Sequence, residues 1–272
     1  MNPVRNHARA GAPKGPSGRA ISNGMKVRAV KTRIFREGQE LTAFIQKHIK
    51  ELKDGSVLAV TSKVVALAEG RVVEAKGKRQ KVKLIREESE WALQTHTEWW
   101  WTERDGALLV NAGIDESNAD NRIILLPKDS YRTAEKTRKE LMRAYKLKKL
   151  GVIITDSRIS PMRAGVTGLA LGYAGFRGVR DYRGKKDIFG KKLKVTMTDV
   201  ADSLATAATL VMGEGNERQP LVIIEDAPVE FVDGFGKLTA RKKEVQISAK
   251  DDMYAPLFKN VAGKRKRRTR RG

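Results

Sequence analysis

The chain has 272 residues, of which 40% are hydrophobic, so it can fill one large hydrophobic core or two smaller ones. It has no cysteine, which excludes disulfides, thiolate nucleophiles and zinc–thiolate centres, and its histidines His7, His48 and His96 have no paired metal spacing. No run of 18 or more apolar residues occurs, so we expect a cytoplasmic protein with no membrane span. Any metal ion is therefore expected on oxygen ligands.

The formal net charge of +23 is concentrated partly at the two ends of the chain. Residues 1–24 hold four basic and no acidic residues, and residues 263–272 (GKRKRRTRRG) hold seven basic and no acidic ones. Both segments are typical of disordered tails. Subtracting these eleven charges leaves +12 for the middle of the chain, which favours anionic partners such as phosphates and carboxylates.

Hydrophobic periodicity between the tails predicts alternating strands and helices, and hence an α+β fold with mixed sheets and packed helices. The predicted strands are 26–31, 56–61, 107–111, 122–127, 151–155 and 221–224, and the predicted helices are 39–52, 133–150 and 200–212. Strand 56–61 is expected to run into a loop, and the polar stretch that ends near Trp101 is expected to be mostly helical. Strands 107–111 and 122–127 are expected to pair with each other. The pattern loses periodicity beyond about Ala227, so residues 229–262 receive no assignment.

The sequence GVIITDS places two polar residues at the predicted end of a buried strand. Open α/β sheets bind ligands at the carboxyl ends of their strands, so Asp156 and Ser157 are candidate ligand-binding residues. The same residues would also suit a turn or the N-cap of a helix. The motif alone does not decide between the two.

The loop NAGIDESN brings Asp115 and Asn118 within three residues of each other beside Gly113. Carboxylate and hydroxyl oxygens are the ligands that Mg²⁺ and Mn²⁺ prefer. Asp and Asn also favour loops for conformational reasons alone, so the loop has a structural explanation as well. The plausible metal ligands in the whole chain are Asp115, Asp156, Ser157 and Glu214.

The sequence MGEGNERQP has two glycines around an acidic residue. Gly213 could simply end the preceding helix as a C-cap. The glycines could instead let the backbone approach a nucleotide and its metal ion. No GxxxxGK[ST] sequence and no strand-bound GxGxxG occurs, so a nucleotide site would be of another kind.

Two further features favour structural explanations. The cluster Trp99, Trp100 and Trp101 is more typical of core or oligomer packing than of a cofactor stack. The terminal KRKRRTRR could contact nucleic-acid phosphates weakly, but it has no interleaved aromatic residues.

Six motifs in order resemble the coenzyme F-420 gamma-glutamyl ligase (CofE-like) family, over about Lys26 to Asp226. They are SVLAVTSKVVALAEGRVV, NAGIDESN, GVIITDS, RDYRGKKDIFGKKLKVT, VADSLATAATLVMGEG and QPLVIIED. The resemblance makes residues 25–228 the ligase domain, which in this family fold can consist of two intertwined α/β subdomains. It implies a homodimer that uses GTP, L-glutamate and two divalent ions, Mg²⁺ or Mn²⁺, with K⁺.

The resemblance also implies roles for individual residues. The acceptor carboxylate would be activated as an acyl phosphate with no catalytic side-chain nucleophile. Asp115 and Asp156 would hold one metal ion, and Ser157 and Glu214 the other. The nucleotide would be contacted by Thr32, Arg33, Ile34, Phe35, Ser62, Lys63, Asn118, Met212, Gly213, Glu214, Gly215, Asn216, Glu217, Arg218 and Gln219.

Three positions depart from the family pattern. Ser157 stands where the family usually has threonine, and Leu67 where a basic residue is common, with Lys63 four positions earlier. The usual FGR-type turn is replaced by RISPMRAG. The amino-acid sequences of the last motifs are most similar to a branch of the family that is proposed to extend folate. The acceptor of the glutamate could therefore be the F-420 precursor or folate.

A rival interpretation is an RNA- or ribosome-associated protein that functions through its basic tails. Deleting residues 263–272 distinguishes the two. A ligase is expected to retain glutamylation after the deletion. A nucleic-acid-binding protein is expected to lose affinity for RNA and to show a shallower dependence of that affinity on salt.

Overall fold

We describe a computed structural model of the chain for residues 24–74, 77–233, 244–248 and 251–258. The predicted tails lie outside these ranges except for Gly24, and the segment 229–262 lies only partly within them. In this described part, no helix combines the length and the apolar character needed to cross a membrane.

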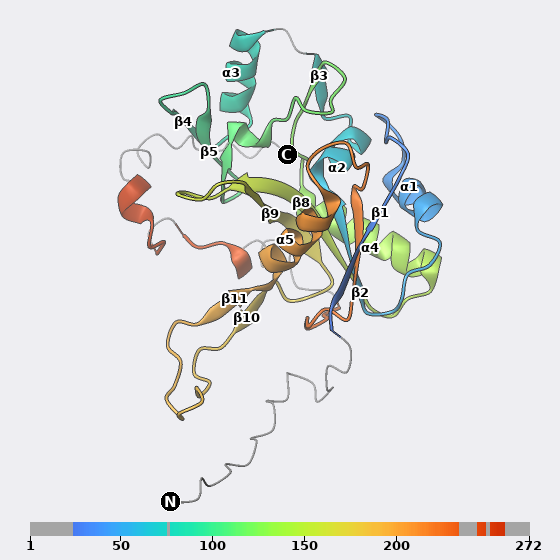
Figure 1. Ribbon diagram of the computed structural model, residues 1–272, viewed down its shortest axis with the longest axis vertical. Helices are drawn as coiled ribbons and strands as arrows, with labels where there is room; N and C mark the ends of the chain where they lie inside the picture. Colours follow the sequence, from blue (N-terminus) through green and yellow to red (C-terminus); the bar gives the residue numbers. More distant parts are fainter. Residues whose placement is uncertain (1–23, 75–76, 234–243, 249–250, 259–272) are drawn as a thin grey trace, which may run out of the picture.

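The structure is built around a five-stranded mixed sheet (Figure 1). Its strands lie in the order β1 (Lys26–Val30), β12 (Leu221–Glu225), β2 (Ser56–Thr61), β8 (Leu150–Ile159) and β9 (Val166–Ala174). β2 and β8 are parallel, whereas all other neighbours in this sheet are antiparallel. The mixed sheet confirms the predicted α+β class.

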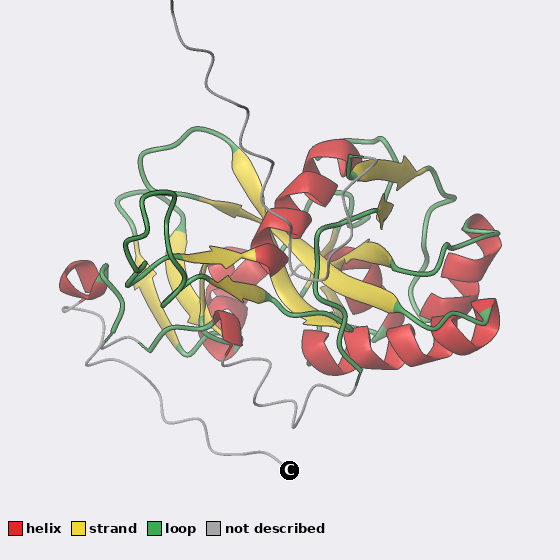
Figure 2. Ribbon diagram, turned by 90° about the horizontal axis from the view of Figure 1, so that it is seen from below, coloured by secondary structure: helices red, strands yellow, loops and turns green. Residues whose placement is uncertain are grey.

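Helices cover both faces of this sheet (Figures 1 and 2). The helices α1 (Leu41–His48), α2 (Ser62–Ala68) and α4 (Ser130–Tyr145) pack together on one face. The helix α5 (Val200–Met212) packs on the other face, with the bounds that the sequence predicts. Its N-cap, Asp199, accepts a hydrogen bond from the backbone N–H of Asp202 at 2.8 Å, so a capping residue fixes where the helix begins.

The side chains of β2 alternate between the two faces of the sheet. Leu58 and Val60 belong to the hydrophobic core under α1, α2 and α4, and Val57 and Ala59 belong to the core under α5. Because both faces are covered, the strand is a continuous apolar run rather than an alternating one.

A smaller layer lies beside the central sheet. β4, β5 and β6 form an antiparallel sheet that packs on α3, and β3 pairs with β7. Their bounds are β3 Val72–Glu74, α3 Lys78–Glu87, β4 Trp91–Gln94, β5 Trp100–Arg104, β6 Ala107–Val110 and β7 Arg122–Ile124. A 3-10 turn, η1 (Asn111–Gly113), follows β6.

Two predictions for this layer were wrong. The stretch before Trp101 contains one helix and two strands rather than mainly helix, because the apolar residues at its end pair as strands across a short turn. The segments 107–111 and 122–127 do not pair with each other, since β6 takes β5 as its partner and β7 takes β3.

Two predictions for the central sheet were also wrong. No loop follows β2, because Thr61 caps a helix that begins at the next residue, its hydroxyl accepting from the N–H of Val64 at 3.4 Å. Strand β8 does not end before Asp156. It continues to Ile159, with Asp156 paired to Leu169 and Ser157 paired to Gly168 on β9. The two polar residues are therefore held inside a paired strand rather than after one.

A bulge in β9 turns its glycines toward opposite helices. The register shifts between Ile154 and Thr155, which leaves one additional residue on β9. A Cβ atom on Gly168 would lie 2.3 Å from the carbonyl oxygen of Ala205 in α5, and one on Gly172 would lie 2.5 Å from the backbone nitrogen of Tyr131 in α4. Both helices therefore approach the strand at backbone contact, which only glycine allows.

The remaining described elements extend the body. β10 (Val179–Asp181) and β11 (Met197–Asp199) form an arm that projects from it (Figure 1) and exposes 92% of Ile188 and 89% of Phe189 between the strands. Beyond β12, Phe231 bridges to Phe176, and a 3-10 turn, η2 (Ala255–Phe258), lies farther along the chain.

Candidate functional site

The site begins where β2 passes directly into α2. Because β2 and β8 are parallel and in register at Thr61 and Thr155, the first residue of α2 lies next to Asp156. The hydroxyl of Ser62 donates to Oδ1 of Asp156 at 3.1 Å. The parallel pairing of β2 with β8 thus brings together a serine and an aspartate that are 94 residues apart in the sequence.

The next residue, Lys63, holds the NAGIDESN loop. Its Nζ lies 2.8 Å from Oδ2 of Asp115 and donates to the carbonyl oxygen of Ser117 at 2.9 Å. The backbone N–H of Ser117 donates in turn to Oδ1 of Asp115 at 2.6 Å. Sequence reasoning did not single out Ser117, although it lies within the same motif.

The far end of that loop meets the glycine loop after α5. Nδ2 of Asn118 donates to the carbonyl oxygen of Gly215 at 3.1 Å. The neighbouring Glu214 accepts from the hydroxyl of Ser157 at 2.6 Å, and Ser157 follows Asp156 in β8. Because Asp156 also contacts Ser62, which precedes Lys63, these contacts form a closed ring.

We call this closed set of contacts the polar ring. It joins α2, the loop after η1, β8 and the loop after α5. Its members are Ser62, Lys63, Asp115, Asn118, Asp156, Ser157, Glu214 and Gly215.

The two aspartates of the polar ring have opposite electrostatic environments. Burial raises the pKa of Asp156 to about 7, Asp115 adds to this rise, and the hydrogen bonds from the Ser157 backbone and from Ser62 offset it only in part. For Asp115, burial also acts upward, but the hydrogen bond and positive charge of Lys63 outweigh it, so the pKa of Asp115 falls below its usual value. The charge of Lys63 lowers the pKa of both aspartates, but its ion pair is with Asp115, so it offsets the burial of Asp156 only in part.

The polar ring fits a hard divalent cation by its chemistry. It offers carboxylate and hydroxyl oxygens, and the raised pKa of Asp156 marks a place where added positive charge would be stabilising. Among the described residues, no three acidic or histidine side chains are grouped closely enough to hold a metal ion by themselves. Asp115 is paired with Lys63, and Glu214 accepts a hydrogen bond from Ser157. A bound cation would replace these contacts of the two carboxylates.

The loop predicted to contact a nucleotide leaves the core at Gly213. Gly213 is the C-cap of α5, one of the two roles that the sequence left open, and its φ of 76° and ψ of 171° form a conformation open essentially to glycine alone. The carboxylate of Glu217 accepts from the N–H of Gly215 at 2.9 Å and closes the loop. Met212 is buried, whereas residues 213–218 are exposed.

The segment 32–35 lies beside this loop. The N–H of Thr32 donates to the carbonyl oxygen of Arg218 at 2.8 Å, which joins the two predicted nucleotide-contacting segments. Phe35 is buried edge-on against Phe44, so its ring belongs to the core, while Ile34 is 71% exposed and Arg33 is also exposed. Of the other predicted residues, Asn216 is exposed and Gln219 is half-buried.

Leu67 occupies no position in the polar ring. It is half-buried against the hydrophobic core one helical turn after Lys63. The basic group of this helix that reaches the NAGIDESN loop is therefore Lys63.

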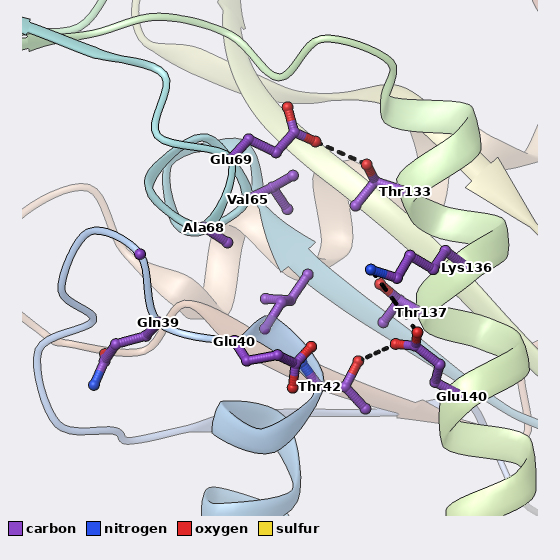
Figure 3. A pocket seen from close by; sticks show the side chains of 12 residues that line it. Gln39, Glu40, Thr42, Val65, Ala68, Glu69, Thr133, Lys136, Thr137 and Glu140 are labelled. Atoms are coloured by element: carbon purple, nitrogen blue, oxygen red, sulfur yellow. Dashed lines mark hydrogen bonds and ion pairs between the residues drawn. The ribbon is translucent and has the colours of Figure 1, made fainter.

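A cavity of about 300 Å³ between α1, α2 and α4 contains none of the predicted site residues (Figure 3). Its carboxylates bind neighbouring protein groups: Glu69 accepts from Thr133 at 2.8 Å, and Glu140 accepts from Thr42 at 2.5 Å. We interpret these contacts as structural, because they hold the three helices together.

The mixed sheet and the polar ring define an α+β protein whose acidic and hydroxyl groups converge beside a glycine-containing loop, an arrangement suited to a divalent cation and a phosphate. Residues 29–226 match the model of the F420-0:Gamma-glutamyl ligase family, and the chain belongs to this family.

Proteins from archaea are similar in sequence to this chain over most of their length. A "Coenzyme F420:L-glutamate ligase" of Methanococcus maripaludis is 37% identical over 78% of this chain and 91% of its own. A protein with the same name from Methanocaldococcus jannaschii is 35% identical over 79% of this chain and 92% of its own length. One from Archaeoglobus fulgidus is 36% identical over 83% of this chain and 94% of its own length.

Proposed function

We propose that the chain is a GTP- and metal-dependent gamma-glutamyl ligase that adds L-glutamate to a carboxylate of the F-420 precursor, with folate as the alternative acceptor. Family membership and the names of the relatives support the reaction class. The single structural observation that carries the proposal is the polar ring, which gathers oxygen-bearing groups from four separate segments.

The reaction would proceed in two displacements. An oxygen of the acceptor carboxylate attacks the γ-phosphorus of GTP, and GDP leaves, which gives an acyl phosphate. The amine of L-glutamate then attacks the acyl carbon, inorganic phosphate leaves, and the new amide nitrogen loses a proton. Two divalent ions, Mg²⁺ or Mn²⁺, together with K⁺, would supply neutralisation of the phosphate charge.

The chain's own residues would position these anions. Asp156 and Asp115 would hold one divalent ion, and Ser157 and Glu214 the other. The exposed backbone of residues 213–218 would approach the nucleotide, because glycines at 213 and 215 leave no side chain in the way. Phosphoryl transfer depends mostly on such positioning and charge neutralisation, so no side-chain nucleophile is needed.

Product mass tests the proposal directly. The purified protein would be given GTP or ATP, MgCl₂ or MnCl₂, L-glutamate, and either the F-420 precursor or folate. A gain of one glutamyl unit on an acceptor is the expected result and names the acceptor. If neither acceptor gains mass under any of these conditions, while a characterised relative succeeds, the proposal is wrong.

Lys63→Ala is expected to weaken GTP binding about tenfold or more. The variant loses the ammonium group that holds Asp115 and Ser117 and that would face the phosphates, and a charge-assisted contact of this kind is worth about 1.5–3 kcal/mol. Isothermal titration with GTP and Mg²⁺ measures the change.

Lys53→Ala is the matched control, because Lys53 also forms a 2.7 Å ion pair, with Glu225, but outside the polar ring. Its Kd for GTP should equal that of the unmodified protein. Equal affinities in all three proteins would remove Lys63 from the nucleotide site.

We further propose a homodimer that works in the cytoplasm. The projecting β10–β11 arm supports the dimer, since its exposed Ile188 and Phe189 are suited to contact with a second copy. A weak contact of the basic tails with nucleic acid stays a prediction, and those tails lie outside the described residues.

A further inference from the structure

A second, larger cavity lies between α3 and the β4–β5 hairpin. Its volume is about 640 Å³, within the range of small-molecule sites. We call it the tryptophan cavity, and it is lined by Gly77, Lys78, Lys81, Val82, Ile85, Gln94, Thr97, Glu98, Trp99, Trp100, Asn111, Glu116 and Ile123.

The two tryptophans of this cavity have different environments. Trp100 is 7% exposed and fixed: Asn111 accepts from its backbone N–H at 3.0 Å, and Arg86 lies 5.1 Å from its ring centroid. Trp99 is 58% exposed, so it does not belong to the core, which was one of the two packing roles that the sequence suggested. An exposed tryptophan beside a cavity offers a ring face for stacking.

The turn that carries Trp99 is already ordered by its own hydrogen bonds. The carbonyl oxygen of Trp99 accepts from the N–H and the hydroxyl of Thr95, both at 2.9 Å, and its N–H donates to the hydroxyl of Thr97 at 3.3 Å. A stacking partner would therefore meet a positioned ring, which reduces the ordering cost of binding.

The floor and the rim of the cavity differ in chemistry. Ile85 and Ile123 in the floor are each 1% exposed. At the rim, Lys78 pairs with Glu98 at 2.6 Å and Lys81 pairs with Glu116 at 2.5 Å. The Lys78–Glu98 pair is more than 80% exposed on both sides, and exposed pairs contribute little, so an anionic ligand could replace the glutamate partner.

The cavity and the polar ring share one loop. Glu116 lines the cavity, and the residue before it, Asp115, binds Lys63 in the polar ring. This shared loop would let a ligand with its ring in the cavity reach the carboxylates of Asp115 and Asp156 with a flexible tail.

We propose that the tryptophan cavity holds the fused, nitrogen-containing aromatic ring of the acceptor, stacked on Trp99, with the anionic tail beside Lys78 and Lys81. This inference rests on the proposed ligase function and adds a location for the acceptor. A deazaflavin and a pterin share this chemistry, and the test below distinguishes them.

Binding without turnover tests the cavity separately from the reaction. The F-420 precursor or folate would be titrated into the full chain without GTP or glutamate, by equilibrium dialysis. Trp99→Ala should weaken binding of one of them about fivefold or more, because stacking of a planar base on an aromatic residue is worth about 1–3 kcal/mol. Lys81→Ala should weaken it as well, and Lys81→Arg should restore it.

Trp101→Ala is the matched control, since Trp101 lies two residues after Trp99, within β5, and is not among the residues that line the cavity. It should leave the acceptor Kd unchanged. In turnover, Trp99→Ala should raise KM for the acceptor and leave KM for GTP and L-glutamate unchanged.

Three results would overturn the cavity assignment. Two are the absence of binding of either compound and equal binding by Trp99→Ala and the unmodified chain. The third is a change of Trp99→Ala from dimer to monomer, which would make the cavity part of a subunit contact. Binding that depends on Trp99, without any glutamylated product, would uphold the cavity and refute the ligase reaction. The two proposals therefore fail separately.

Discussion

Asp156→Asn is expected to reduce glutamylation more than about 100-fold. Replacement of residues that only support a metal ligand costs about 10–100-fold, and Asp156 is proposed to be a ligand itself. Asparagine keeps the size and the acceptor for the Ser62 hydroxyl but removes the charge that would hold the cation. Product mass spectrometry and titration with Mn²⁺ measure the loss of turnover and of metal binding.

The same variant should fold at least as stably as the unmodified chain when no metal is added. The pKa of Asp156 is about 7 in the folded protein, against 3.8 for an unperturbed aspartate, so the folded state keeps a proton that the unfolded state releases between these values. The free energy of unfolding should therefore fall as pH rises from about 4 to about 7. Asp156→Asn should flatten this part of the pH profile, as measured by urea unfolding.

Asp181→Asn is the control for both measurements. Asp181 is an exposed aspartate that pairs with Arg183 on the β10–β11 arm, outside the polar ring. It should keep full turnover, and the profile between pH 4 and pH 7 should stay as in the unmodified chain, because Arg183 lowers the pKa of Asp181 to about 2. Full turnover in Asp156→Asn, or a loss that merely follows unfolding, would contradict the role given to the polar ring.

Gly168→Ala is expected to destabilise the fold by about 2–3 kcal/mol, through overpacking between β9 and α5. The added Cβ would lie 2.3 Å from the carbonyl oxygen of Ala205 and 2.4 Å from its carbonyl carbon, and backbone atoms of a packed helix cannot move aside cheaply. For a domain of this size the melting temperature should fall by roughly 5–10 °C. Thermal unfolding followed by circular dichroism measures it.

Gly24→Ala is the matched control for this substitution. Nothing lies within 4 Å of a Cβ atom at Gly24, and its φ needs no glycine, so the melting temperature should not change. Gly172→Ala, which meets α4 instead of α5, should behave like Gly168→Ala. A melting temperature unchanged in both β9 variants would show that the two helices can withdraw from the sheet at little cost.

The sequence predicts this fold best where one local signal is sufficient. Helix α5 has the predicted bounds because an alanine-rich periodic stretch lies between a capping aspartate and Gly213. Helix α2 was missed because Val64 and Val65 favour strands when considered locally, whereas the cap at Thr61 and packing under the sheet decide for a helix. The continuation of β8 beyond Thr155 depends on its partner β9, which no local pattern reveals.

The site shows the same division. Single motifs suggested Asp115, Asp156 and Glu214 as candidate oxygen ligands, and the order of six motifs along the chain indicated the family. The contacts that join them could not be predicted, since the Lys63–Asp115 and Ser157–Glu214 pairs each link residues that are more than 50 positions apart. The tryptophan cavity was missed because the exposure of Trp99 depends on a hairpin that sequence reasoning took for helix.

The position of β12 constrains how the protein is made. This last strand of the central sheet lies between β1 and β2, the first two strands to leave the ribosome. β1 therefore waits without a neighbour until about 190 further residues have been translated, and β2 exposes an unpaired edge for most of that time. The nascent chain consequently keeps unpaired strand edges, which favour aggregation, until β12 has been made.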